Sequence, residues 1–311
     1  MGLQRQYTGT AGRVENARVA VYLAYATRAG HALIDHRLHL PASCTDDPDR
    51  LPDHVGFATQ PQWAGEMITD ALDAGTPARW VAADEVYGQN PRLRRELEQR
   101  RLGYVPAVPR RERLGLAGGP ATAADLAALV PRRAWQRLPA GTGAKGQRCH
   151  DWAPVDAEPA PEGHRWALIR RHRATGELAF YRCYAPDPVP LSRLVAVAGR
   201  RWAVEECFQQ GRGLAGLDGH QVRTWCPWHR WSLFAVLAYA FLAVLAAADR
   251  HQNPTTSTLT ALTCNEIHHL FNTLFAVPPD PGRLAGWSLF RRRHQARARQ
   301  CHHRRQATRE P

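Results

Sequence analysis

Residues 200–212, RRWAVEECFQQGR, carry the pattern that decides the fold. As a helix, this stretch places Arg201 four residues before Glu205 and Arg212 seven residues after it, which puts all three on one helix face. The apolar residues between them anchor the helix. A carboxylate flanked by arginines on a packed helix suits a metal ion that meets a phosphate backbone. On spacing alone, a surface ion pair is the more common explanation of such a pattern.

The composition of the chain favours a polyanionic partner. Its 311 residues are 44% hydrophobic, enough for a large core, and 41 Lys and Arg against 28 Asp and Glu give a net charge of +13. Nearly all of these cations are arginines, whose planar donors match phosphate. The alternative is a GC-rich genome that enriches arginine without selection for binding. Nucleic acid is the favoured partner.

The cysteines and the N-terminus indicate a cytoplasmic protein. Seven cysteines are scattered without a C-x-x-C pair, which fits reduced thiols rather than a disulfide framework or a zinc knuckle. The first residues form no apolar signal segment. Residues 231–248 are almost entirely apolar and just reach the length of a membrane span. Because this segment is alanine-rich and stands alone in a basic chain, we expect a buried core helix and no membrane partner.

The order of predicted elements indicates an α/β fold. The N-terminal part predicts a hairpin, a loop and then helices alternating with strands, at residues 13–25, 30–39, 41–60, 61–74, 79–83, 91–101 and 104–108. Residues 109–190 are punctuated by prolines and glycines and contain a short helix at 122–130 and a second hairpin at 166–172 and 177–184. We interpret them as a β-rich insertion. Helices follow to about residue 248, with a short one at 265–275 and a basic, partly helical tail at 291–309.

Asp84 is the second candidate for chemistry. It stands at the carboxyl end of a predicted strand, the edge where ligands gather in open α/β sheets. Phosphodiester chemistry needs such a carboxylate together with others, because divalent metals are shared between them. Mg²⁺ suits this role through its preference for oxygen ligands. A helix-capping aspartate is the plain alternative, and Glu85 could be the relevant acid instead.

Several segments resemble the DDE insertion-sequence transposases. Residues 80–88, WVAADEVYG, resemble the second-aspartate motif of that family, and the opening stretch resembles its third-acid motif, Y-x2-R-x3-E-x6-K. Arg201 and Glu205 match the R and the E, Arg212 stands at the K, and Ala198 departs from the Y. Further matches, in order along nearly the whole chain, lie at residues 4–13, 30–35 and 216–223.

The resemblance implies an RNase H-like mixed sheet flanked by helices, with a β-rich insertion between the second Asp and the Glu. We therefore expect core residues 1–108, an insertion at 109–190, the last part of the core at 191–250, and a C-terminal helix and basic tail at 251–311. It also implies Mg²⁺-dependent cleavage and strand transfer of double-stranded DNA at element ends and target, with Mn²⁺ as a substitute ion. A homodimer in the DNA complex and a bacterial, nucleoid-associated location follow from it.

The implied site roles fall on six residues. Asp84 and Glu205 would be the catalytic metal ligands, and Arg201 and Arg212 would contact DNA phosphates. Tyr87 and Trp225 are weaker candidates for DNA contact, as is the arginine-rich tail.

The family's first catalytic aspartate has no counterpart in this sequence. It precedes the segment that residues 4–13 match, and neither Glu15 nor Asp35 occupies its position. The first strand is central in such a sheet, so its absence would leave two strand edges unpaired. We therefore expect an N-terminally truncated and inactive transposase. The alternatives are a non-catalytic DNA-binding remnant and a membrane-anchored protein that uses residues 231–248.

Overall fold

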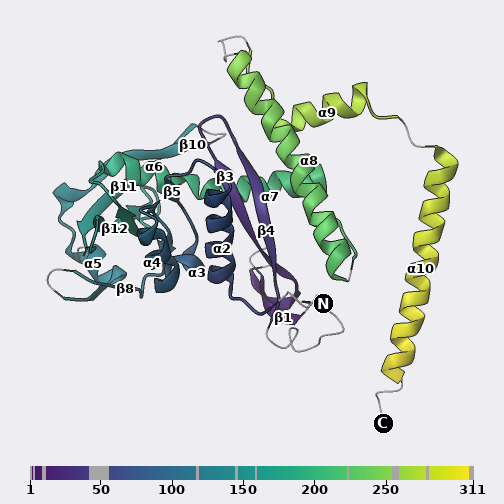
Figure 1. Ribbon diagram of the computed structural model, residues 1–311, viewed down its shortest axis with the longest axis horizontal. Coiled ribbons are helices and arrows are strands. Elements are labelled where there is room, and N and C mark those ends of the chain that lie inside the picture. The colour runs from purple at the N-terminus through teal and green to yellow at the C-terminus, as the bar shows by residue number, and fades with distance from the viewer. Residues whose placement is uncertain are drawn as a thin grey trace. The chain divides into compact units, whose positions relative to one another are not determined.

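The fold is mixed α/β, with a curled mixed sheet flanked by helices, as an RNase H-like fold requires (Figure 1). The computed structural model describes residues 2, 4–8, 12–41, 56–116, 119–143, 146–157, 160–222, 224–253, 259–277 and 280–307. Residues 9–11, most of the predicted loop 41–60 and Arg223 lie outside this set. The chain divides into two compact units, Met1–Cys264 and Asn265–Pro311.

The first unit contains most of the secondary structure. Its strands are β1 (Gln4–Thr8), β2 (Arg13–Ala17), β3 (Val19–Ala26), β4 (His31–His39), β5 (Trp80–Val81), β6 (Gly103–Tyr104), β7 (Ala107–Val108), β8 (Arg113–Leu114), β9 (Ala121–Thr122), β10 (Gln136–Gly143), β11 (Gly146–Asp156), β12 (His164–Arg171) and β13 (Leu178–Ala185). Its helices are α2 (Gln60–Asp73), α3 (Glu85–Gly88), α4 (Pro91–Gln99), α5 (Ala123–Leu129), the 3-10 turn η2 (Arg132–Ala134), α6 (Leu191–Arg200), α7 (Trp202–Ala215) and α8 (Trp225–Gln252).

The main sheet joins the predicted insertion to the predicted core. Its strand order is β10-β11-β12-β13-β6-β5, with β7 also paired to β13. Strands β10 to β13 are antiparallel neighbours, whereas β5 runs parallel to β6. The junction is the pairing of Tyr184 in β13 with Tyr104 in β6. The strand-rich region is therefore a continuation of the core sheet.

The hairpin β10–β11 has no counterpart among the predicted strands. Pro139, Gly141 and Gly143 interrupt the alternation of side chains along β10, and its register with β11 shifts between Pro139 and Thr142. An outermost strand tolerates proline because one row of its backbone groups needs no ladder partner. Because of these residues, β10 lacks the alternating pattern from which a strand is predicted.

The predicted N-terminal hairpin is present as β3–β4, with Thr27 and Gly30 closing its turn. The predicted strand 13–25 is divided at Arg18, and its first part, β2, pairs with β1. Among the described strands, β3 pairs only with β4, and β5 pairs only with β6. Leu23 of β3 and Val81 of β5 nevertheless join one hydrophobic cluster with α2 and α4. Helix α2 thus bridges two strands that do not pair.

The two helices nearest β5 follow from their capping residues. Thr59 and Gln62 form a capping box at the start of α2, which matches the predicted helix 61–74. Asn90 caps α4 by accepting the backbone N–H of Leu93 at 2.9 Å. This helix ends at Gln99, before the predicted residue 101, because Arg101 adopts a left-handed backbone with φ of 55°.

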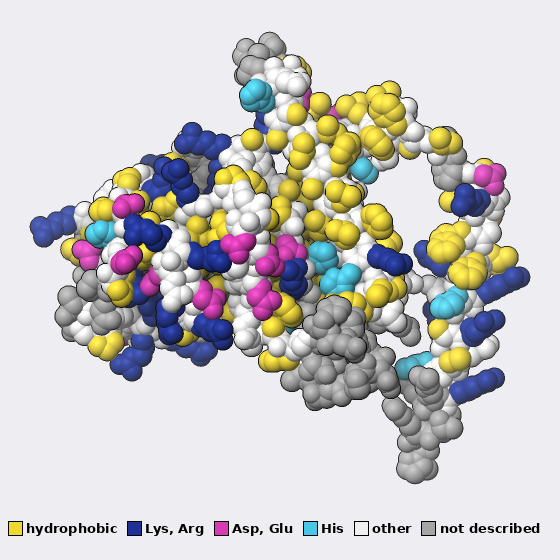
Figure 2. Space-filling model, viewed as in Figure 1, with side chains coloured by type: hydrophobic (Ala, Val, Ile, Leu, Met, Phe, Trp, Pro, Cys, Tyr) yellow, Lys and Arg dark blue, Asp and Glu magenta, His cyan; other side chains and the backbone are white. Residues whose placement is uncertain are grey.

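Helix α8 packs on one side only. Its inner face, which includes Ser232, Val236 and Tyr239, is buried. Large side chains on the other face are exposed: Leu233, Phe234, Leu237, Phe241 and Val244. Figure 2 shows hydrophobic side chains gathered along α8. The prediction of a buried core helix therefore holds for one face, and by length and composition α8 is also apolar enough to cross a membrane.

The second unit consists of α9 (Cys264–Leu274), most of which belongs to it, and α10 (Pro281–Ala307). The predicted short helix at 265–275 and the helical character of the basic tail are both present. Helix α10 exposes the aromatic rings of Trp287 and Phe290, which stack with centroids 5.6 Å apart, next to its run of arginines.

Candidate active site and adjoining basic cleft

Asp84 stands at the carboxyl end of β5, as predicted. Backbone hydrogen bonds from Val105 to Val81 and from Ala107 to Ala83 extend the parallel pairing up to this residue. The Asp84 carboxylate accepts the backbone N–H of Glu85 at 2.8 Å, so Asp84 also caps α3. Its side chain is exposed. The capping role and a ligand role are compatible, because a carboxylate has several acceptor positions.

Helix α3 holds Asp84 in place through its close contact with the sheet. A Cβ added to Gly88 would lie 1.9 Å from the carbonyl oxygen of Ala107, so only glycine fits there. Tyr87 packs in the cluster formed with α2 and α4. Burial, reinforced by the Asp84 carboxylate, raises the pKa of Tyr87 to about 12. Tyr87 is therefore a protonated, half-buried neighbour of Asp84.

The stretch predicted as one helix forms two helices that meet at Arg201. This residue ends α6 and begins α7 with helical angles of φ −52° and ψ −33°. One turn later, Glu205 forms an ion pair with Arg201, in which Arg201 Nη1 and Glu205 Oε1 are 3.6 Å apart. The side chains are 28% and 46% exposed. The surface ion pair is thus present, and such pairs contribute little to stability.

Asp84 and Arg201 have a common neighbour in Tyr181 of β13. Burial raises the pKa of the Tyr181 phenol, Arg170 and Arg201 oppose the increase, and Asp84 adds to it. Trp80 of β5 and Ala198 of α6 also join one hydrophobic cluster with Tyr181. The strand that precedes Asp84 and the helix that precedes Arg201 therefore pack into the same part of the core.

Asp84 and Glu205 are both exposed carboxylates, the type of oxygen ligand that Mg²⁺ accepts while it retains waters. No hydrogen bond or ion pair between described residues joins Asp84 to Glu205. Within the described ranges, no group of three His, Cys, Asp and Glu side chains forms a metal cluster.

The other predicted residues lie at different places. Arg212 follows on α7, where its Nε donates to the Phe208 carbonyl oxygen at 3.1 Å. Trp225 begins α8 and packs its ring on His229, with centroids 4.1 Å apart. Ala198, at the position where the motif has tyrosine, is buried in the core beneath α6.

A basic cleft lies beside Arg201. It has a volume of about 590 Å³ and lies between the β10–β11 hairpin and the α6–α7 junction. Among the described residues, its lining includes three arginines, Arg148, Arg170 and Arg201, and one acid, Glu206. Figure 2 shows basic side chains gathered over the β10 end of the sheet.

The cleft contains buried polar nitrogens without a partner among the described residues. They are Arg148 Nε, His150 Nδ1 and Arg170 Nε. The Arg148 guanidinium lies over the Trp202 ring, 5.6 Å from its centroid. Burial, with nearby Arg170, His172 and Arg148, lowers the pKa of His150, so the positive charge of the cleft comes from its arginines. Unpaired buried donors next to positive charge suit an anionic ligand.

Apart from Arg201, the arginines and the histidine of this cleft are absent from the sequence-based site. Their signal is alternation: Arg148, His150 and Trp152 are spaced by two residues along β11, and Trp152 is paired with Arg170 in β12. Side chains with this spacing lie on one face of a sheet. The prediction missed them because β11 was not recognised as a strand.

Comparison with known proteins agrees with this description. Residues 1–138 match the family described as DDE superfamily endonuclease. The match includes Asp84 and ends before Glu205. No curated protein matches the chain. The match supports assignment to the DDE transposases and a transposase or endonuclease function. This family implies DNA as the substrate, and its nucleases generally use divalent metals.

Proposed function

We propose that this chain is the catalytic portion of a DDE transposase that cleaves and joins double-stranded DNA. The observation that carries the proposal is the position of the Arg201–Glu205 pair: Arg201 lines the basic cleft, and the helix that precedes it shares a core cluster with the strand before Asp84. The family match covers the Asp84 half, and the third-acid motif adds Glu205 from outside the matched region. Two separate parts of the chain thus suggest the same chemistry.

Each residue has a defined role. Asp84 and Glu205 would hold Mg²⁺, which would supply activation of a water or a 3′-hydroxyl and stabilisation of the leaving oxygen. Arg201 orients the Glu205 carboxylate and presents its remaining guanidinium donors to a DNA phosphate. Arg148 and Arg170 bind the strand along the cleft, and Arg212 contacts the backbone farther along α7. Mn²⁺ replaces Mg²⁺ with the same ligands.

We propose that a third carboxylate completes the metal site. Asp35 is poorly suited to this role, because its Oδ1 accepts hydrogen bonds from Arg37 and from the backbone of His36. A strand that pairs with the edges of β3 and β5 left open among the described strands would place an aspartate at the end of β5. Without a third carboxylate, we expect DNA binding and no cutting.

Plasmid nicking with Mg²⁺ or Mn²⁺ tests the proposal. The arms are the chain itself, the chain extended by the segment encoded directly upstream, and that extended chain with Glu205→Gln. We expect nicking only in the extended chain with Glu205 intact, and DNA binding in all three. Nicking by the chain itself that depends on Glu205 would remove the need for a third acid. Failure of every form to cut would contradict the nuclease function.

Two other functions have specific support. The basic cleft alone would serve a non-catalytic DNA-binding protein that competes with an intact transposase, and Glu205→Gln would then leave that competition unchanged. The exposed apolar face of α8 would serve membrane attachment. Recovery of the chain in the membrane pellet after a salt wash would favour attachment, whereas recovery in the supernatant favours a nucleoid-associated, cytoplasmic protein. A homodimer in the DNA complex is part of the transposase proposal.

A further inference from the structure

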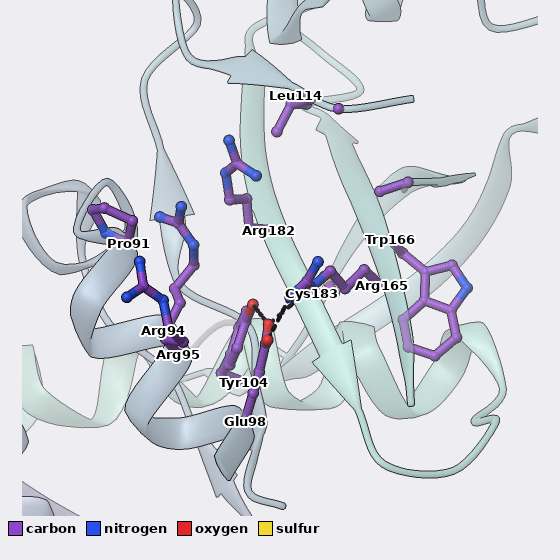
Figure 3. Close-up of a pocket in the computed structure, with 12 residues that line it drawn as sticks. Pro91, Arg94, Arg95, Glu98, Tyr104, Leu114, Arg165, Trp166, Arg182 and Cys183 are labelled. Carbon is purple, nitrogen blue, oxygen red and sulfur yellow. Dashed lines mark hydrogen bonds and ion pairs between the residues drawn. The ribbon is translucent and has the colours of Figure 1, made fainter. Parts of the chain in front are cut away.

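A second cavity lies on the α4 side of the main sheet, and none of its lining residues lines the basic cleft. It has a volume of about 210 Å³ and is bounded by α4, β6, β12, β13 and the segment after β8. Figure 3 shows Arg94 and Arg95 rising from α4 on the side of Arg182, while Arg165 enters from the opposite wall. Four arginines therefore converge on a space too small for duplex DNA.

Among the described residues, acids pair with two of the four arginines. Glu98 accepts a two-pronged hydrogen bond from Arg165 and a third bond from the Tyr104 hydroxyl at 2.7 Å. Burial opposes ionisation, but these bonds hold the pKa of Glu98 below its ordinary value. Glu112 Oε1 accepts hydrogen bonds from both Nε and Nη2 of Arg182, at 3.2 and 3.0 Å. Both carboxylates are thus occupied.

Arg94 and Arg95 supply the excess positive charge. No ion pair between described residues includes either of them. Arg94 is half-buried and donates to the carbonyl oxygen of Gly88. Burial, together with the neighbouring Arg182, lowers the pKa of Arg94, because both make its charged form less favourable. An anion in the cavity would relieve this repulsion.

We propose that this cavity binds a small phosphate-bearing anion, either inorganic phosphate or the terminal phosphate of a nucleotide, through Arg94, Arg95 and Arg182. Arginine forks bind phosphate oxygens in pairs, and several forks around one anion give both affinity and orientation. Among the described lining residues the one carboxylate is Glu98, which already accepts three hydrogen bonds and so does not present an open negative charge to the ligand.

The site bears on the candidate active site through Gly88. The Arg94 guanidinium holds the Gly88 carbonyl at the end of α3, and Asp84 begins that helix. An anion that fixes Arg94 therefore fixes the helix that positions Asp84. The proposal does not depend on the transposase function, because Arg94, Arg95 and Arg182 are neither proposed metal ligands nor proposed DNA contacts.

Thermal unfolding and calorimetric titration of the full chain test the proposal, at constant ionic strength, with inorganic phosphate, adenosine triphosphate and chloride. We expect a saturable rise in Tm with phosphate that chloride does not produce. Tighter binding of the nucleotide would identify the terminal phosphate as the natural group, and equal or weaker binding would identify free phosphate. Both results support the site.

The variants make the test specific. Arg95→Met removes an exposed cavity arginine with little effect on folding, and it should weaken phosphate binding about tenfold, as expected for a lost charge-assisted contact. Arg94→Met should weaken binding at least as much. Arg92→Met is the matched control, because Arg92 lies on the same helix outside the cavity and pairs with Glu96. Equal responses from all three variants, or displacement of phosphate by a short DNA duplex, would overturn the proposal.

Discussion

Gly199 of α6 lies directly against Ala140 of β10: a Cβ built on Gly199 would stand 1.6 Å from the Ala140 carbonyl oxygen. No side chain fits there unless the helix or the strand moves. This contact sets the position of α6 on the hairpin that forms the other wall of the basic cleft. Two residues later, Arg201 begins the helix that carries Glu205.

Replacing Gly199 with alanine should therefore separate α6 from β10. We expect a loss of about 2–3 kcal/mol in the free energy of unfolding, as for overpacked core sites. DNA affinity should fall as well, because Arg201 moves with the helix. Urea unfolding and DNA titration measure the two effects. Gly213→Ala is the matched control: nothing lies within 4 Å of its added Cβ, so it should stabilise α7 by about 0.5–1 kcal/mol.

Glu205→Gln should change activity and leave stability nearly unchanged. The Arg201–Glu205 pair is partly exposed, so its loss should alter the free energy of unfolding by less than about 0.5 kcal/mol. In a form of the protein that cuts DNA, the variant should abolish metal-dependent cleavage while retaining DNA affinity. A large loss of stability would show instead that the pair is structural.

Arg148→Met should weaken DNA binding and its dependence on salt. Removing one phosphate contact lowers the slope of log affinity against log salt by about one. Titration of a fluorescent duplex at several salt concentrations measures this slope. Arg92→Met removes the same charge at a residue that does not line the cleft, so it should leave the slope unchanged. Equal effects of both variants would indicate a general charge effect and no specific cleft.

His229 should make the protein less stable in mild acid. Burial, with His36 and Arg37 nearby, lowers the pKa of the His229 imidazole to about 4. Between that value and the ordinary pKa of about 6.5, the unfolded chain binds a proton that the folded chain does not, so stability falls as pH falls through this window. After discounting for solvent screening, we expect a loss of about 1 kcal/mol.

Unfolding of the protein at pH 7.5 and at pH 5.0 checks this expectation. His229→Phe should reduce the difference in stability between the two pH values, because the ring packing against Trp225 and Trp228 survives without the titrating group. His269→Phe, an exposed change on α9, should leave the difference intact. An unchanged pH dependence in His229→Phe would assign the effect to other histidines, such as His36.

The sequence was most informative where local signals were strong. Capping residues and alternation predicted α2, α4 and the β3–β4 hairpin, and the spacing of Arg201 and Glu205 predicted their ion pair. It was least informative in β10 and β11, because Pro139 and three glycines break the pattern that pairing with a neighbouring strand restores. The cleft arginines depend on that pairing, so sequence alone could not assemble them.

The two-sided character of α8 was also beyond the sequence. Its residues are apolar all round, and only the packing of Tyr239 against β4 and α7 decides which face is inside. Similarly, the cavity beside α4 brings together Arg94 and Arg182, which are far apart in the chain. Such sites arise from tertiary contacts rather than from local periodicity.

Among the described strands, β3 and β5 each have one unpaired edge, and these edges should promote self-association of the protein at high concentration. Each edge presents a row of backbone donors and acceptors that a neighbouring molecule can pair with. Light scattering should therefore increase with protein concentration and with storage time. A short synthetic peptide with alternating apolar residues, added in excess, should suppress that growth by occupying the edges first.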